Sequence, residues 1–232
     1  MSPTSQAAVS RRLATATTFD SLDPATDEVV GTHPVHTDEE VRAAVDLART
    51  EAAWWAGLSF TERGRHLTAW KATMVRRLPE LVETVHRETG KPLGDAMLEA
   101  GLAIEYIEWA AGHARKVLGR RKVSAGLLMF NQSASVAYKP LGVIGVIGPW
   151  NYPVFTPLGS ISYALAAGNA AVFKPSEYTP GVGVWLAERD SRRPWAVRSS
   201  RSSPASAPPA PHCATPGPTR SPSPDRRPPA RR

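Results

Sequence analysis

The chain has 232 residues, of which 42% are hydrophobic, and this is enough to build one large domain or two small ones. Residues 1–189 carry 19 Lys and Arg against 19 Asp and Glu, so the whole formal net charge of +7 belongs to residues 190–232. This distribution excludes a basic nucleic-acid-binding surface on the main part of the chain, and the single cysteine, Cys213, excludes an internal disulfide and a cysteine-based metal cluster.

The first segment, residues 1–19, is rich in Ser and Thr, lacks acidic residues and shows no periodic pattern. Its composition is similar to that of a transit peptide, but a disordered N-terminus is the simpler interpretation. No apolar run in the chain approaches the roughly 18 to 20 residues needed to cross a bilayer. Together with the single cysteine, this favours a cytoplasmic protein without a membrane partner.

Helices dominate the expected structure of the first half. Residues 20–34 predict a turn, a short strand and a second turn. Thr37 and Glu40 are spaced as a capping box, and apolar residues continue from Val41 at helical spacing, which predicts a helix. The same spacing, with turn residues at the ends, predicts further helices near 61–78, 79–89 and 94–117. This half is therefore expected to be a layer of amphipathic helices.

The pattern changes at residues 121–140, which we interpret as a two-stranded hairpin. An apolar strand at 142–148, a helix at 155–167 and a second apolar strand at 170–174 follow. Such a βαβ unit requires a parallel sheet, whose strands are covered on both faces. This explains why the two strands do not alternate between apolar and polar residues.

Residues 190–232 have a different composition from the rest of the chain. They hold 11 of the 22 prolines and contain no Leu, Ile, Met, Phe or Tyr. A segment of this kind buries too little apolar area to offset its chain entropy, so we expect it to be disordered. The domain prediction is therefore one folded region, residues 20–189, between two disordered ends.

Two polar motifs follow the strands of the βαβ unit, GPWNYP (148–153) after the first and KPSE (174–177) after the second. Ligands of open α/β sheets bind outside the carboxyl ends of the strands, so both motifs belong to the expected binding edge. Lys174 and Glu177 are suited to the vicinal hydroxyls of a ribose, and Glu177 would repel a 2′-phosphate. The alternatives are a stiff turn with a packed Trp and a solvated ion pair.

The run PLGVIGVIGPWNYPVFTPLGSISYALAAGNAAVFKPSEYTP (140–180) and the segment ETGKPLGDA (88–96) resemble the aldehyde dehydrogenase superfamily. The resemblance covers roughly residues 20–189. It implies an α/β fold with a partial Rossmann-like cofactor domain, built from an N-terminal helical layer and an incomplete parallel sheet and followed by the disordered tail. It also implies that intact family members oxidise an aldehyde to a carboxylic acid with NAD, with NADP as the alternative cofactor, and that they are homo-oligomers joined through a hairpin like 121–140.

Carried over from the family, Asn151 is the carboxamide that stabilises the oxyanion of the aldehyde adduct. The resemblance also implies a set of cofactor-binding residues around the two motifs, namely Ile147, Pro149, Trp150, Asn151, Lys174, Pro175, Ser176 and Glu177. It implies no metal.

Two motifs of the family do not occur in the 232 residues: the GQxC-type segment with the nucleophilic cysteine and the ELGG-type segment with the general base. Cys213 lies in PAPHCATPG, where no apolar neighbours would order it against Asn151 or lower its pKa. We therefore expect an inactive, truncated form, in which a frameshift or unrelated sequence replaces the family sequence near residue 189.

Two other functions stay open at this point. A non-catalytic assembly module would pair with full-length subunits through the hairpin at 121–140. The arginine-rich residues 190–232 would bind polyanions weakly and with a steep salt dependence, although a solvated extension is the simpler interpretation.

Overall fold

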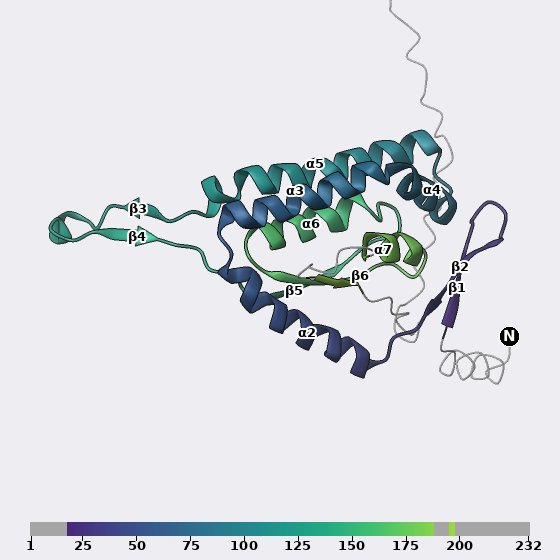
Figure 1. Cartoon of the computed structure of the whole chain (residues 1–232), viewed down its shortest axis with the longest axis horizontal. Helices are drawn as coiled ribbons and strands as arrows, with labels where there is room; N and C mark the ends of the chain where they lie inside the picture. Colours follow the sequence, from purple (N-terminus) through teal and green to yellow (C-terminus); the bar gives the residue numbers. More distant parts are fainter. Residues whose placement is uncertain (1–17, 188–194, 198–232) are drawn as a thin grey trace, which may run out of the picture. The chain divides into compact units, whose positions relative to one another are not determined.

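The computed structural model describes residues 18–187 and, for their backbone, residues 195–197 (Figure 1). It begins with a hairpin in which β1 (Thr18–Leu22) pairs antiparallel with β2 (Val29–Pro34). The sequence predicted one short strand in this region, so the first strand is a correction. Composition predicted disorder for residues 1–19, but β1 begins at Thr18. The burial of Phe19 explains why the ordered region begins earlier than predicted. Residues 1–17 lie outside the described part.

Four helices follow, in agreement with the predicted helical layer. Their bounds are α2 (Asp38–Gly57), α3 (Phe60–Arg76), α4 (Leu78–Thr89) and α5 (Leu93–Leu118). The capping box at the start of α2 is present, with the Glu40 N–H donating to Thr37 Oγ1 at 3.3 Å and the Thr37 N–H donating to Glu40 Oε2 at 2.8 Å. Gly90 ends α4 with a φ of 70°, the left-handed conformation that glycine adopts at little cost. Local sequence signals therefore set most of these helix ends.

A hairpin extends from the end of α5. Its strands β3 (Arg121–Val123) and β4 (Ala134–Val136) are antiparallel, which confirms the two-stranded prediction. A short 3₁₀ turn, η1 (Leu127–Met129), lies between them. The turn residues carry apolar side chains that are largely exposed, Leu127, Leu128, Met129 and Phe130.

The predicted βαβ unit is confirmed: β5 (Val143–Ile147), α6 (Phe155–Ala166) and β6 (Ala170–Lys174) form it, and the two strands are parallel. Helix α7 (Pro180–Ala187) follows β6. A third parallel strand, β7 (Trp195–Val197), pairs with the other side of β6, so the order is β5-β6-β7. β7 belongs to the segment for which composition predicted disorder; the other residues of 188–232, including Cys213, lie outside the described part.

Helices cover both faces of this sheet. In Figure 1, α6 lies on one side of β5 and β6, beneath α3 and α5, and α2 lies on the other side. The α2 face is packed by small residues, because Ala48 and Ala52 contact Ala170. The main core lies on the α6 side and includes large buried side chains from every layer, among them Trp55, Leu67, Met74, Ile107, Leu158 and Phe173. No helix within the described ranges is long and apolar enough to span a membrane.

Candidate functional site

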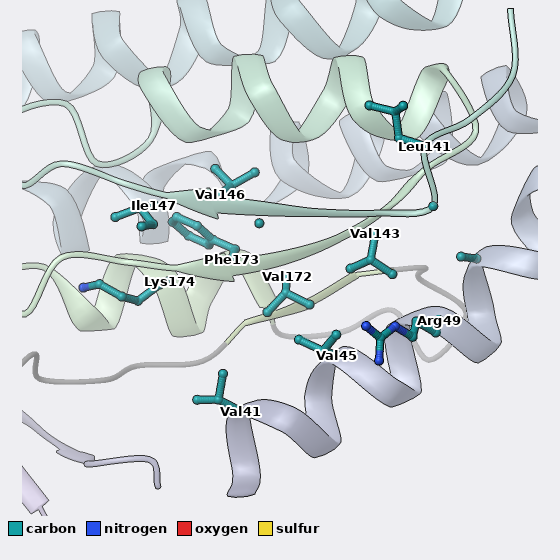
Figure 2. A pocket seen from close by; sticks show the side chains of 13 residues that line it. Val41, Val45, Arg49, Leu141, Val143, Val146, Ile147, Val172, Phe173 and Lys174 are labelled. Carbon is teal, nitrogen blue, oxygen red and sulfur yellow. The ribbon is translucent and has the colours of Figure 1, made fainter. Parts of the chain in front are cut away.

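The two polar motifs emerge side by side from the sheet. Ile147, the last residue of β5, is the register partner of Lys174, the last residue of β6. The pairing continues one residue further, because the Gly148 N–H donates to the Lys174 carbonyl at 2.9 Å. Figure 2 shows the Ile147 and Lys174 side chains at this common strand end. The expectation that both motifs belong to one edge of one sheet is therefore met.

A close backbone approach brings the GPWNYP turn to this position. A Cβ atom at Gly148 would lie 2.8 Å from Cε2 of Phe173, so only glycine lets β5 end directly over that ring. After Gly148 the chain turns outward. Trp150 is 58% exposed, Asn151 is exposed, and the chain becomes buried again at Pro153. Asn151 is thus presented on a solvent-facing turn directly after the strand end.

The KPSE turn holds its two charged side chains near each other. Lys174 Nζ donates to the Pro175 carbonyl at 2.9 Å and lies 3.9 Å from Glu177 Oε2. Both side chains are partly exposed, at 26% for Lys174 and 34% for Glu177. Ser176 is buried instead, and its Oγ accepts from the Tyr178 N–H at 3.3 Å, so its hydroxyl shapes the turn. A donor and an acceptor are therefore accessible at the end of β6.

An open cavity of about 690 Å³ lies between α2 and the sheet (Figure 2). Its walls are mainly apolar, and Ile147 and Lys174 are the only two of the predicted cofactor-binding residues that line it. The other predicted residues follow the strands, at Pro149–Asn151 and Pro175–Glu177, outside that lining. The structure therefore brings the two motifs to one edge but not into one pocket. Within the described ranges no cluster of His, Cys, Asp and Glu has the arrangement of a metal site.

Asn169 fixes the start of β5. Its Oδ1 accepts the N–H groups of Leu141 at 2.6 Å and Gly142 at 3.0 Å, and its Nδ2 donates to the Ala164 carbonyl at 3.2 Å. This buried side chain links the entry of β5 to the turn between α6 and β6. In the sequence analysis, Asn169 appears only within the run 140–180 that carries the family resemblance.

Two residues near the site were missed by sequence reasoning. Glu99 on α5 accepts hydrogen bonds from the N–H groups of Val154 at 2.9 Å and Phe155 at 3.2 Å, directly after the GPWNYP turn. Lys91 pairs with the same carboxylate. A signal for Glu99 was present, since it is an acidic residue between the buried Ala96 and Ala100 on one helix face. Lys91 belongs to ETGKPLGDA, which was used only for the family resemblance.

Comparisons with known proteins agree with these features. Residues 12–189 match the Aldehyde dehydrogenase family. Aminoaldehyde dehydrogenase 2, peroxisomal, of Pisum sativum is 37% identical over 161 residues, which make up 67% of this chain and 32% of that protein. The chain spans about a third of the length of the curated relatives it matches.

Solved structures share the fold. The NAD-dependent aldehyde dehydrogenase from Sinorhizobium meliloti has a TM-score of 0.74 at 31% identity, over 83% of this chain and 39% of that chain. The NADP-dependent glyceraldehyde-3-phosphate dehydrogenase from Bacillus halodurans C-125, complexed with NADP, has a TM-score of 0.73 at 27% identity, over 81% of this chain and 41% of that chain. The sequence motifs, the βαβ unit and the match over residues 12–189 agree, and the protein belongs to the aldehyde dehydrogenase family.

Proposed function

We propose that residues 20–189 are the N-terminal part of the cofactor-binding domain of an enzyme that oxidises an aldehyde to a carboxylic acid with NAD⁺ or NADP⁺. The observation that carries the proposal is the register pair Ile147 and Lys174, which puts the GPWNYP and KPSE motifs at adjacent strand ends. That edge is where open α/β sheets bind ligands. The solved relatives named above use NAD in one case and NADP in the other.

In this proposal, Lys174 and Glu177 bind the two hydroxyls of the adenosine ribose. Lys174 donates and Glu177 accepts, which suits a vicinal diol. The carboxylate of Glu177 would repel a 2′-phosphate, so the proposal favours NAD over NADP. Ile147, Pro149, Trp150, Pro175 and Ser176 border the cofactor.

Asn151 acts on the reacting carbonyl. When a nucleophile adds to the aldehyde carbon, negative charge develops on the oxygen, and the Nδ2 group of Asn151 would donate a hydrogen bond to it. One such donor contributes about 2.7–4 kcal/mol to transition-state stabilisation in other enzymes. A bound NAD⁺, held by Lys174 and Glu177, would supply the acceptor for the hydride that the adduct loses, and hydrolysis of the resulting acyl–nucleophile bond would release the acid.

The chain alone is proposed to be inactive, since its 232 residues contain neither a GQxC-type nor an ELGG-type segment. The proposal includes a cytoplasmic location, which the single cysteine favours because no internal disulfide can form.

The test of the cofactor site is a calorimetric titration of the full chain with NAD and with NADP. Saturable NAD binding is expected. Lys174→Met should weaken it about tenfold or more, because a hydrogen bond from a charged donor contributes about 1.5–3 kcal/mol. Glu177→Gln removes the charge that repels a 2′-phosphate, so it should reduce the ratio of the affinity for NAD to the affinity for NADP. Lys122→Met, on the exposed strand β3, is the matched control. No saturable NAD binding, or equal losses in the two lysine variants, would refute the proposed site.

A second candidate function is a non-catalytic module that pairs with full-length subunits of the family. The apolar turn of the β3–β4 hairpin favours it, because Leu128 is 93% and Phe130 is 86% exposed. Co-purification with a full-length family member should be lost on Leu128→Ser and retained on Leu98→Ser, which changes an exposed leucine on α5. Equal behaviour of the two variants would remove the hairpin from this role.

A further inference from the structure

The turn that carries Asn151 is held at both of its ends. On the upstream side, Gly148 is joined to β6 by the hydrogen bond from its N–H to the Lys174 carbonyl, at 2.9 Å. On the downstream side, Val154 and Phe155 donate their N–H groups to one carboxylate oxygen of Glu99, at 2.9 and 3.2 Å. Only the five residues from Pro149 to Pro153 lie between these two fixed points.

Glu99 replaces a local helix cap. Val154, at the N-cap position of α6, makes no capping hydrogen bond with its own side chain. The first N–H groups of a helix need external acceptors, and a negative charge near them is stabilised by the helix dipole. Glu99 supplies both the acceptor and the negative charge from α5, and its side chain is only 1% exposed. A buried carboxylate requires compensation, and Lys91 provides it through the second carboxylate oxygen.

Lys91 extends the same network to the neighbour of Asn151. Its Nζ lies 4.2 Å from the ring centroid of Tyr152, within the range of a cation–π interaction. The backbone of Lys91 is fixed as well, because its N–H donates to Thr89 Oγ1 at 3.2 Å. One ammonium group therefore contacts both the carboxylate that anchors α6 and the aromatic ring beside Asn151.

We propose that Glu99 and Lys91 are positioning residues, which together set the direction of the Asn151 side chain. Their role in a reaction rests on the proposed function of Asn151. Their role in fixing the turn rests only on the contacts above. Neither residue belongs to the set that the family resemblance implied.

The fold offers a matched control for this proposal. Glu88, on α4, is also a buried carboxylate, and it accepts from the N–H groups of Gly181 at 2.8 Å and Val182 at 2.9 Å at the start of α7. A general loss of stability would follow from changing either glutamate. A change confined to the Asn151 turn would follow only from changing Glu99.

The experiment is nuclear magnetic resonance of the full chain, reading the side-chain NH₂ signal of Asn151 and amide hydrogen exchange. Glu99→Ala should shift or broaden the Asn151 signal. It should also speed amide exchange at Val154 and Phe155 about tenfold or more. The reason is that the loss of a hydrogen bond to a charged acceptor favours the open, exchanging state by about that factor. Gly181 and Val182 donate to different oxygens of Glu88, so Glu88→Gln, which keeps one of them, should speed exchange at one of these two amides and leave the Asn151 signal in place.

A second pair of variants separates the two positioning residues without leaving a buried charge unpaired. Glu99→Gln keeps one acceptor oxygen, so exchange at Val154 and Phe155 should stay slow. Adding Lys91→Met to it removes the cation over Tyr152 and should move the Asn151 signal further. An unchanged Asn151 signal in Glu99→Ala, or an equal change in Glu88→Gln, would overturn the proposal.

These measurements need no cofactor. If NAD failed to bind the unaltered chain while Glu99→Ala still moved the Asn151 signal, the proposed function would fail and the positioning of the turn would stand. If NAD bound normally and the signal did not move, the positioning would fail alone.

Discussion

At the scale of single residues, Gly148 is the position where the site and the core constrain each other most directly. A Cβ added to Gly148 would lie 2.8 Å from the ring of Phe173, a side chain that is only 1% exposed. The absence of a side chain at Gly148 therefore lets β5 end against this ring. A larger residue must displace that ring.

Gly148→Ala should therefore lower the free energy of unfolding by about 1–3 kcal/mol, the usual cost of overpacking a core. Urea denaturation would measure it. Gly145→Ala, on the same strand, is the control, because its Cβ would meet nothing within 4 Å. Similar losses in both variants would mean that contact with Phe173 is not the cause.

Glu88 predicts a pH dependence of stability. Burial raises the pKa of this carboxyl above its usual value of 4.5, although the hydrogen bonds from Val182, Ser21 and Gly181 oppose the rise. The folded chain therefore binds a proton that the unfolded chain releases, in the window from 4.5 up to the folded pKa. Within this window, stability falls as pH rises.

The unaltered chain should therefore become more stable relative to Glu88→Gln as the pH is lowered through that window. The quantity to compare is the free energy of unfolding of the two chains at each pH. Chemical denaturation at a series of pH values would show the difference. A difference that grew in the opposite direction would contradict the raised pKa.

Buried charges were the residues that the sequence predicted least well. Glu88, Glu99 and Arg63 each lie on an amphipathic helix, where a charged side chain is normally exposed. Each has at least one partner that is distant along the chain: Ser21 for Glu88, Val154 for Glu99 and Ala166 for Arg63. Periodicity carries no information about such contacts.

At the scale of elements, α2 tests how far a local signal stabilises a helix. Thr37→Ala removes the side-chain acceptor of its capping box and should cost about 0.5–2 kcal/mol. Thermal or chemical unfolding would measure the loss. Thr50→Ala, in the same helix, should cost less or stabilise, because Ala has the higher helix propensity. If Thr50→Ala cost as much, the cap would have no special role.

Elements with strong local signals could be predicted, and the short strands β1 and β7 could not. The helices from α2 to α5 have capping residues, left-handed glycine or long apolar periodicity, and the βαβ unit has two apolar runs of the right length. β1 has only five residues and depends on pairing with β2. β7 has three residues within a Pro-rich, Arg-rich segment, and it exists through pairing with β6. Such pairing is invisible to composition.

At the scale of the whole molecule, β5 is the vulnerable element. Among the described residues it pairs on one side only, with β6, and Ile147 is 76% exposed. An exposed apolar edge promotes association between chains. The chain should therefore scatter light increasingly as its concentration rises.

Ile147→Lys should reduce this scattering, because a charge on an edge strand opposes pairing with another chain. Leu47→Lys, which introduces the same charge at a 57% exposed position of α2, is the control. An equal reduction in both variants would point to net charge as the cause, rather than to the strand edge.

The side chain of Asn169 has a consequence for protein synthesis. Leu141 and Gly142 donate their N–H groups to an oxygen that lies 28 and 27 residues further along the chain. On the ribosome, β5 therefore emerges from the exit tunnel while Asn169, its anchor, is still inside it. A pause in translation at that stage would leave an apolar strand outside the ribosome without the side chain that fixes its start, and a chaperone could bind it there.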